Sequence, residues 1–388
     1  MPNSSLSAGE DEIAQLNFLF IGPRLHPNYS DFLRELGNEA SVKVVVSTFF
    51  QNDDFEGLDF RAFPASLFNS LRRRFYRTDE ALETFLFRRN CPSLAWIIYY
   101  LIKNRIHTVV ARSENKAFYR KVRIASFLLS VKMFTFRQGI LQHDTKIDRY
   151  SLWPLKKGDL DEQRCHNYVP LGISIPRCKS GKVRPGRIDS GTLRLVSVGK
   201  FVERKGHRLV VDAVDLIKNQ LSIKIDIFGS YGGPSAEYRV ALQEEIYLRG
   251  LEEFIELMPA VTRSEMLRNY EKYDAYLFAG WSNAKVQSFA ETYERANGTN
   301  GTLLFSMLEA MSVGLPVICS SDKKVVGSVE NDANGLVFES GNASDLARKI
   351  RSLNNLDLRE MGEHSLRIAS EHHNVKDVHA SFTRLVFR

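Results

Sequence analysis

The sequence lacks any apolar run long enough to span a membrane. The two longest runs are SLAWIIYYLI at 93–102 and the segment at 124–131. Both fall far short of the roughly 20 residues that a transmembrane helix needs. The sequence therefore argues against a membrane-spanning protein.

Cysteine is also scarce. The chain has 4 cysteines, which lie far apart and show no metal-ligand spacing: Cys91, Cys165, Cys178 and Cys319. The sequence also shows no signal peptide, so the pattern favours free thiols in a reducing compartment over a disulfide framework. We expect a cytoplasmic protein.

Internal repeats, low-complexity tracts, a P-loop, a dinucleotide-binding glycine pattern and nucleic-acid motifs are all missing. The composition is that of a soluble globular protein, with 44% hydrophobic and 26% charged residues. A chain of 388 residues exceeds the size at which one core keeps growing, so we expect two domains.

The first half alternates short buried strands with helical patterns. Strands are predicted at 16–22, 42–48, 107–113 and 132–139, with a helix around 29–36. Strands that alternate with helices are typical of a parallel sheet covered on both faces.

The alternation restarts after a stretch at 178–192 that is rich in Gly, Pro, Ser and charge and reads as a linker. Helices separate the new strands and continue to the end of the chain, and 279–301 reads as an extended loop or short helix before one of them. The predicted strands are 193–199, 223–229, 254–258, 274–280 and 316–321.

The fold class is thus α/β, with two Rossmann-like domains facing a cleft. We assign 14–177 to the first domain and 193–370 to the second. A C-terminal helix within 371–388 is expected to pack back on the first domain.

A carboxylate interrupts the apolar helix in LLFSMLEAMSVGLPVICSS, residues 303–321. Apolar residues recur there at helical spacing, Gly314 suits a left-handed cap and Pro316 stops the helix. Glu309 must therefore either face a polar pocket or pair with a structural arginine. The local pattern leaves both open.

A second notable segment is VSVGKFVERKGH, residues 196–207. It places Gly199 and Lys200 at the end of a strand, with Lys205 and a further glycine just before a helix. Such a strand-to-helix turn favours an anionic ligand at the helix N-terminus, although solvated lysines would give the same local pattern.

Taken together, these segments resemble the GT-B glycosyltransferases, specifically the retaining glycosyltransferase family 4 group. The resemblance covers about 190–355 and includes IDIFGSYGGPSAEY, YEKYDAYLF and VENDANGLVF besides the two segments above. In the first half only the strand–helix rhythm matches, together with YVPLGISIP at 168–176, which is similar to the family's strand before the interdomain segment.

The resemblance implies roles for several residues. Lys205 would neutralise the diphosphate of a nucleotide sugar, and Lys200 stands where the family usually has Arg. Glu309 would bind the ribose hydroxyls. The other donor-binding positions would be Gly199, Asn300, Gly301, Thr302 and Leu303, the last three forming a helix start.

The sequence departs from the family motif at one position. The first carboxylate of the Glu-x7-Glu motif should stand at position 301, where this chain has Gly301. Asn300, Glu291 and Glu294 are the candidate substitutes, and the sequence does not choose among them. Lys323 and Lys324 also replace a Gly-Gly pair.

Neither a metal nor a cofactor is expected, because two lysines and a helix terminus can stabilise a departing diphosphate. The pair Asp159 and Asp161 follows LKKG rather than a buried strand and reads as surface charge.

Polar residues that follow first-domain strands are the candidates for acceptor binding. The segment 112–115 belongs to this group, and the leading candidates are Arg24, His26, Arg137, Gln138 and His143. Solvated loop residues are the alternative.

Basic charge is concentrated in one region. Residues 61–140 contain 16 Lys and Arg against 4 Asp and Glu, a local balance of +12, so the rest of a chain of net charge +7 carries −5. Within 69–90, apolar residues at helical spacing are surrounded by Arg72, Arg73, Arg74, Arg77, Arg88 and Arg89. This pattern predicts either an amphipathic helix on the inner face of an anionic membrane or a helix packed on the core.

The leading interpretation is a retaining, metal-independent glycosyltransferase that uses a nucleotide-diphosphate sugar and a glycan or lipid-linked acceptor. Two alternatives remain: a phosphorylase on the same fold, and a non-catalytic protein that binds a nucleotide sugar or a protein partner. Binding to nucleic acid is not expected.

Overall fold

The computed structural model divides the chain into two compact units, each of which has its own sheet. Unit 1 comprises 1–138, 142–174 and 375–388, and unit 2 comprises 139–141 and 175–374. The structure describes residues 16–22, 29–47, 58–63, 91–112, 116–136, 151–152, 169, 172–175, 191–230, 234–280, 286–287, 292–293, 304–321 and 328–386.

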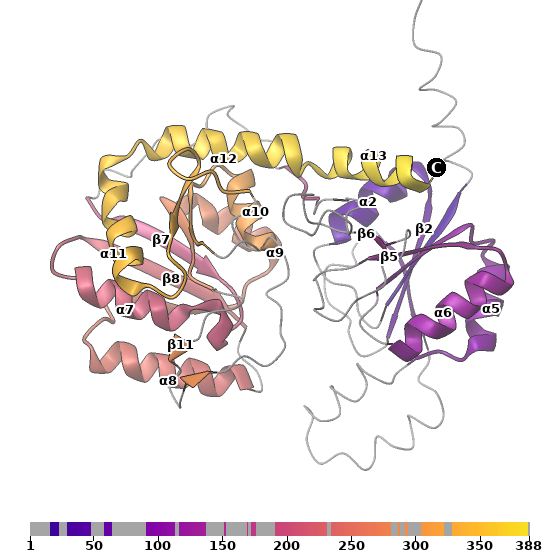
Figure 1. Ribbon diagram of the computed structural model, residues 1–388, viewed down its shortest axis with the longest axis horizontal. Coiled ribbons are helices and arrows are strands. Elements are labelled where there is room, and N and C mark those ends of the chain that lie inside the picture. The colour runs from indigo at the N-terminus through magenta and orange to yellow at the C-terminus, as the bar shows by residue number, and fades with distance from the viewer. Residues whose placement is uncertain are drawn as a thin grey trace, which may run out of the picture. The chain divides into compact units, whose positions relative to one another are not determined.

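Unit 1 is built on a parallel sheet in the order β3-β2-β1-β4-β5-β6 (Figure 1). Every neighbouring pair in it is parallel. The strands are β1 (Asn17–Ile21), β2 (Ser41–Ser47), β3 (Asp59–Phe63), β4 (Thr108–Arg112), β5 (Lys132–Phe136) and β6 (Ser151–Leu152). The predicted strands of the first half are confirmed, and β3 and β6 are strands that the sequence pattern did not reveal.

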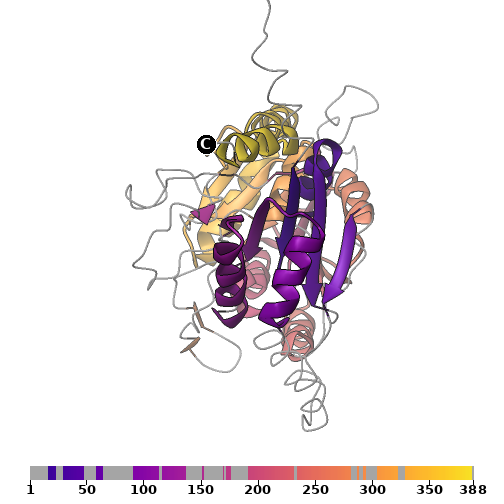
Figure 2. The ribbon, with the colours of Figure 1, turned by 90° about the vertical axis from the view of Figure 1, so that its right-hand side faces the viewer.

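Both faces of this sheet are covered, because successive side chains of a strand point to opposite faces. Phe18 and Phe20 of β1 pack with α2 (Ser30–Glu39) and α13 (Val375–Val386). Leu19 and Ile21 pack with α5 (Leu94–Lys103) and α6 (Lys116–Leu128). Figure 2 shows α5 and α6 side by side in front of the sheet.

The C-terminal helix α13 completes the core of unit 1. The ring of Phe382 lies 5.2 Å from that of Phe32 and 6.0 Å from that of Phe18, between centroids. The backbone N–H of Val375 donates to the carbonyl of Ile173 at 3.0 Å. In the predicted strand 168–176, Ile173 forms a single bridge rather than a strand in the part that is described.

Unit 2 has a second parallel sheet, in the order β14-β13-β10-β7-β8-β9. Its strands are β7 (Leu193–Val198), β8 (Ile223–Gly229), β9 (Ile255–Pro259), β10 (Ala275–Phe278), β13 (Val317–Ser320) and β14 (Gly335–Phe338). The expectation of helices alone after 321 was wrong. The short segment Gly335–Phe338 is an edge strand parallel to β13, with a pattern too brief to stand out.

Helices cover this sheet as well. Helix α7 packs against α11, and α10 packs against α12 and the strands β10 and β13. The helices are α7 (His207–Ile217), α8 (Pro234–Leu248), α9 (Arg263–Asn269), α10 (Phe305–Ser312), α11 (Ala343–Ser352) and α12 (Leu358–His372), with short 3-10 turns η6 (Glu203–Lys205), η7 (Tyr270–Lys272) and η8 (Leu353–Asn355).

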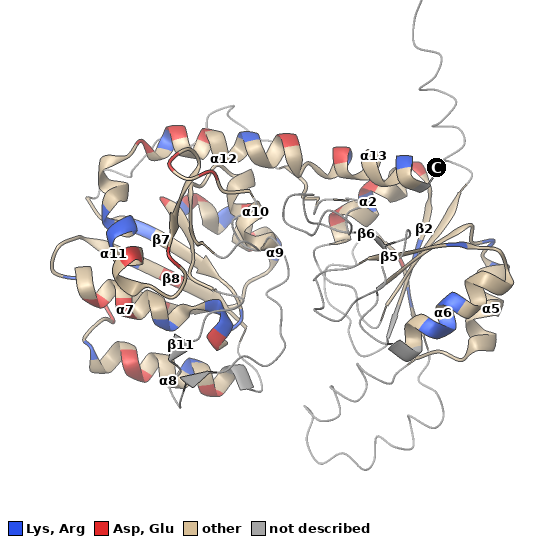
Figure 3. Ribbon diagram, in the orientation of Figure 1, with Lys and Arg blue, Asp and Glu red and all other residues tan. Residues whose placement is uncertain are grey.

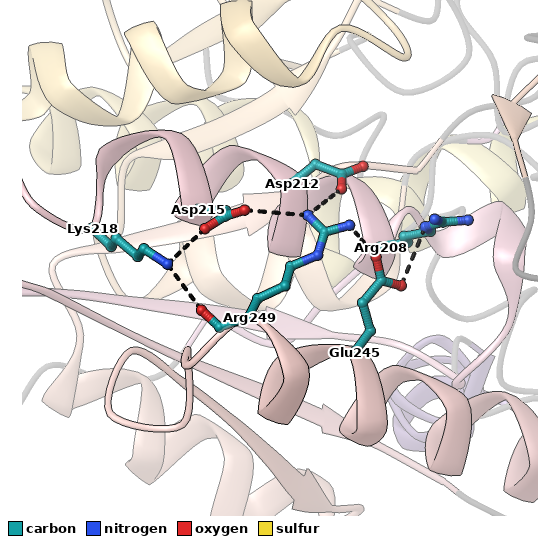
Figure 4. A network of polar contacts seen from close by, with 6 residues as sticks. All are labelled: Arg208, Asp212, Asp215, Lys218, Glu245 and Arg249. Carbon is teal, nitrogen blue, oxygen red and sulfur yellow. Dashed lines mark hydrogen bonds and ion pairs between the residues drawn. The ribbon is translucent and has the colours of Figure 1, made fainter.

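A network of charged side chains joins α7 to the end of α8 (Figure 4). Arg249, just after α8, pairs with Asp212 at 2.8 Å and with Glu245 of α8. Arg208 reaches Glu245 at 3.3 Å. These contacts hold α7 on the side opposite to its apolar face, so the helix is held from two sides. Helix α7 directly follows the loop at 199–206 that carries Lys200 and Lys205, which we call the lysine loop.

Of the two alternatives predicted for 279–301, an extended loop or a short helix, the described residues exclude a helix at 286–287 and 292–293. Strands β11 (Val286–Gln287) and β12 (Thr292–Tyr293) pair antiparallel, which is not the short helix considered from the sequence.

Candidate functional site: the end of β7 and the turn before α7

The lysine loop leaves the sheet of unit 2 where the strand order reverses. In chain order, β7, β8 and β9 run toward one edge of the sheet, and β10, β13 and β14 run toward the other. The reversal lies between the neighbours β7 and β10. Ligands of open α/β sheets bind outside the carboxyl ends of the strands at such a switch point.

The backbone turns sharply after β7. Residues of η6 are followed by Gly206, which has a φ of 72° and precedes α7 directly. A methyl group on Gly206 would overlap the carbonyl oxygen of Ala279 just beyond β10. Only glycine therefore lets the turn lie this close to the end of β10.

Lys205 is placed by this turn at the carboxyl end of the sheet. Its ammonium group lies 5.0 Å from the ring centroid of Phe278, the last residue of β10. Its side chain also lies against Gly199, where an added methyl would stand 3.3 Å from Cδ of Lys205. Gly199 and Lys205 are thus neighbours, as the sequence pattern predicts.

The charge of Lys205 is poorly compensated. Burial, together with the positive charges of Arg204 and Lys200, lowers the pKa of Lys205 from 10.5 to about 7. No carboxylate within the described ranges forms an ion pair with it. A partly buried ammonium among like charges is a site where an anion would be stabilised.

His207, the first residue of α7, ties the loop together. Its side chain is buried, and its Nε2 lies 3.1 Å from the carbonyl oxygen of Lys200. Burial lowers the pKa of His207 to about 4, so the ring is neutral at physiological pH and its Nε2–H donates to the carbonyl. His207 therefore holds the backbone of Lys200, while the Lys200 side chain stays exposed.

Glu309 lies on α10, a helix that packs on β10 and β13. Its side chain is buried, and its Oε1 accepts from Nε of Arg263 at 2.5 Å. The guanidinium of Arg263 also lies 5.0 Å from the ring centroid of Phe305 in the first turn of α10. The arginine partner considered from the sequence is therefore present, and it comes from the start of α9.

Two tyrosines and a serine form a hydrogen-bonded group next to Glu309. The Tyr276 hydroxyl lies 2.8 Å from Oγ of Ser306, and the Tyr270 hydroxyl donates to the carbonyl of Ser306 at 3.0 Å. Burial raises the pKa of both tyrosines, and the Glu309 charge adds to it. These phenols stay protonated and keep α10 fixed to β10.

Helix α10 begins at Phe305, with Leu304 as its N-cap. The helix start expected at Gly301, Thr302 and Leu303 is therefore displaced toward the C-terminus. As predicted, Gly314 ends the helix with a φ of 83°.

Most of the other predicted site residues lie outside the described residues. These are Arg24, His26, Arg72, Arg73, Arg74, Arg77, Arg88, Arg89, Arg137, Gln138, His143, Asn300, Gly301, Thr302 and Leu303. The candidate substitutes Glu291 and Glu294 are outside them too, as are Cys165 and Cys178. The two cysteines that are described, Cys91 and Cys319, are buried free thiols.

The described part of the chain contains no group of three or more His, Cys, Asp or Glu side chains that could hold a metal ion. No helix within the same described ranges is long and apolar enough to cross a membrane.

The sequence patterns did not reveal three residues of this region. Phe278 and Arg263 contact Lys205 and Glu309 from elements far away in the chain, which no local pattern expresses. His207 carried a usable signal, because it directly follows the Lys205–Gly206 pair.

Comparison with protein families identifies the second unit. Residues 182–367 match the family described as "Glycosyl transferases group 1". Most of the second unit is therefore similar to this family. The matched range contains the lysine loop, the switch point and Glu309.

Two curated proteins are similar over part of the chain. The amylovoran biosynthesis glycosyltransferase AmsK of Erwinia amylovora is 26% identical over 156 residues, which are 40% of this chain and 34% of AmsK. The putative colanic acid biosynthesis glycosyltransferase WcaL of Escherichia coli is 24% identical over 192 residues, 49% of this chain and 42% of WcaL. The matches thus span less than half the length of either relative.

Solved structures support the fold over nearly the whole chain. Anabaena HepE, crystallised in complex with UDP-glucose, aligns with a TM-score of 0.69 and 13% identity, covering 96% of this chain and 100% of HepE. Two Rossmann-like units with structural neighbours of this kind make up the GT-B fold, as the sequence predicts.

Proposed function

We propose that this protein is a glycosyltransferase that moves a sugar from a nucleoside-diphosphate sugar to a hydroxyl of a glycan or lipid-linked acceptor. The observation that carries the proposal is Lys205, a partly buried ammonium beside two other cations at the switch point of the sheet. A bound diphosphate would compensate this charge.

The chemistry follows from where negative charge develops. The bond between the anomeric carbon and the diphosphate oxygen breaks, a bond from that carbon to the acceptor oxygen forms, and the acceptor hydroxyl loses its proton. The departing diphosphate gains charge, which the ammonium groups of Lys205 and Lys200 and the N-terminus of α7 would stabilise. Transfer with retention and without a divalent metal is part of the proposal.

Glu309 is assigned to the ribose hydroxyls of the donor. Because Arg263 donates to one carboxylate oxygen, the side chain is held in a single orientation on a rigid helix. Arg263 is thus a positioning residue that acts through Glu309.

A UDP-sugar is the first donor to test, since HepE is a protein of the same fold that was crystallised with UDP-glucose. AmsK and WcaL are named for polysaccharide biosynthesis, which supports a growing glycan as acceptor. The acceptor side is assigned to unit 1, with Arg24, His26, Arg137, Gln138 and His143 as candidates. The arginine-rich segment 72–89 would contact an anionic acceptor or membrane.

Binding should be measured first, by thermal shift with UDP-, GDP-, ADP- and TDP-sugars, using wild type and Lys205→Met. We expect one nucleotide to stabilise the wild type and not the variant. Release of free nucleoside diphosphate in the presence of acceptor then tests transfer. Stabilisation by none of the nucleotides would remove the proposal.

Two other outcomes identify the alternatives. Stabilisation by inorganic phosphate with no response to nucleotide sugars would indicate a phosphorylase. Nucleotide binding without turnover on a panel of acceptors would indicate a non-catalytic protein. Gly301 at the position of the first motif carboxylate is the specific observation that favours this last class.

A further inference from the structure

The outward faces of α5 and α6 form one surface of unit 1. Both helices pack their inner faces on the same side of the sheet, with Ile97 and Leu101 from α5 and Phe118 and Val122 from α6 in a common core. Helices that cover the same face of a sheet turn their opposite sides to the same solvent. Figure 2 shows the two helices next to each other in front of the strands.

This surface, which we call the α5–α6 face, exposes large apolar side chains. On α6, Phe127 is 83% exposed and Leu128 is 60% exposed, and Ile124 one turn earlier is 47% exposed. On α5, Ile102 is 60% exposed and Tyr99 is 56% exposed. Single exposed apolar residues are ordinary, but five on two adjacent helices form a patch that points to an interaction.

The same face is positively charged. Arg120 and Arg123 are exposed on α6, and Lys103 is exposed at the end of α5, with its ammonium 5.5 Å from the ring centroid of Tyr99. Neither helix contains an aspartate or glutamate. In Figure 3, α6 carries blue and no red.

On α6 the charged and apolar positions share one stripe. Exposed residues occur at 120, 123, 124, 127 and 128, which is the spacing of a single helical face. Cations therefore stand at one end of the stripe, and Phe127 and Leu128 stand at the other.

We propose that the α5–α6 face binds peripherally to the surface of an anionic lipid bilayer. Apolar side chains would enter the boundary between headgroups and acyl chains, and the basic side chains would meet anionic headgroups. A nucleic acid would bind the basic side chains of this face but would leave the apolar side chains of Leu128, Ile102 and Ile124 exposed to water. A second copy of the chain would bring the same cations together, which is unfavourable.

This inference goes beyond the proposed function and does not depend on donor chemistry. It also concerns residues other than the arginine-rich segment 72–89. If the acceptor is lipid-linked, this face would hold unit 1 at the membrane where that acceptor lies.

Co-sedimentation with vesicles tests the proposal directly. Full-length protein is mixed at low and high salt with phosphatidylcholine vesicles or with vesicles containing about 30% phosphatidylglycerol. This fraction of anionic lipid carries enough charge to reveal attraction of basic side chains. The apolar variant is Phe127→Ser/Leu128→Ser. The charge variant is Arg120→Gln/Arg123→Gln.

The chain offers a matched control. Tyr247 and Leu248 at the end of α8 are 70% and 81% exposed. Like Phe127 and Leu128, they are an apolar pair near the end of a helix, but α8, unlike α6, contains acidic residues. The control variant is therefore Tyr247→Ser/Leu248→Ser. All these positions are exposed, so the variants should fold, which far-UV circular dichroism verifies.

We expect binding to anionic vesicles only, weakened by high salt. Neutralising two arginines should weaken it about 30-fold, which corresponds to about 2 kcal/mol at 1 kcal/mol per basic residue. The apolar variant should bind anionic vesicles at least about tenfold more weakly, because it has less apolar surface to bury in the bilayer. The control variant should bind like the wild type.

Other results would overturn the proposal. Equal binding to both vesicle types, or anionic binding unchanged in both variants, would remove the bilayer assignment. Binding to heparin or DNA as strong as to vesicles, unaffected in the apolar variant, would mean a purely electrostatic surface. Dimerisation lost in the apolar variant, without vesicle binding by the wild type, would assign this face to a second copy.

Discussion

Replacing Lys205 by methionine should stabilise the free protein while removing its nucleotide binding. Methionine fills a similar volume beside Gly199 and Phe278 but carries no charge. In the wild type, burial and two neighbouring cations lower the pKa of Lys205 from 10.5 to about 7. The folded state therefore carries a penalty for the charged form that the unfolded state does not.

The sign of the effect of pH on stability follows from the lowering of the Lys205 pKa in the folded state. Between about pH 7 and 10.5 the unfolded chain binds the proton and the folded chain has released it, so stability rises with pH over that window. Below pH 7 both states are protonated and the penalty is complete. The free energy of unfolding of Lys205→Met should thus exceed that of the wild type most at pH 6 and progressively less at higher pH.

The magnitude can be bounded. A shift from 10.5 to about 7 corresponds to about 5 kcal/mol at 1.36 kcal/mol per pKa unit. Because water entry and relaxation weaken the desolvation of a partly buried group, this figure is the upper bound on the stability added at pH 6. About half of it should remain at pH 9, two units into the window of 3.5.

Urea unfolding of wild type and variant at pH 6 and pH 9 measures this difference. Lys200→Met is the matched control, because the Lys200 side chain is exposed and its charge is the smallest of the three causes of the pKa shift, so its removal should change the free energy of unfolding far less than that of Lys205. The reasoning would be refuted by a Lys205→Met variant that is less stable than the wild type at pH 6, or by one whose advantage does not change with pH.

Nucleotide binding gives an independent check on the same group. A bound diphosphate should raise the pKa of Lys205 well above 8, so binding at pH 8 should take up about one proton. Calorimetry in buffers of different ionisation enthalpy detects this uptake. Titration with no proton uptake would mean that Lys205 does not contact the nucleotide.

Four further outcomes are expected. Glu309→Gln should raise the donor KM about tenfold or more. Its Tm should fall by only a few degrees, because the amide oxygen can still accept from Arg263. A large loss of stability with unchanged donor KM would mean a purely structural carboxylate. Arg263→Met should raise the donor KM in the wild type but add little in the Glu309→Gln background, and additive effects in this double-mutant cycle would contradict a positioning role. Gly206→Ala should lower the free energy of unfolding by about 3 kcal/mol through positive φ and overlap with a carbonyl, whereas Gly250→Ala, with positive φ but open space, should lose only about 1 kcal/mol. Transfer should persist in excess EDTA, and activity lost with chelator and restored by Mg²⁺ would exclude the metal-independent mechanism.

Local sequence patterns were sufficient to predict the class of fold. The strands buried on both faces read as continuous apolar runs, as in FLFI of β1 and AYLF of β10, because neighbours on both sides exclude water. The turn before α7 was also visible, since a glycine that directly follows a lysine between a strand and a helix is typical of a tight turn. The two-residue strands β11 and β12 were too short to be told from loops, and GLVF of β14 offers only three apolar residues after a glycine.

Only the tertiary structure decided what surrounds the predicted site. Lys205 lies over Phe278 because β7 and β10 are neighbours at the reversal of strand order, although the two residues lie far apart in the chain. Glu309 meets Arg263 because α9 and α10 lie close together, which their own sequences do not express. A chain encodes its secondary structure through near neighbours, but burial, compensation of charge and therefore the pKa of Lys205 depend on groups that approach only when the sheet forms.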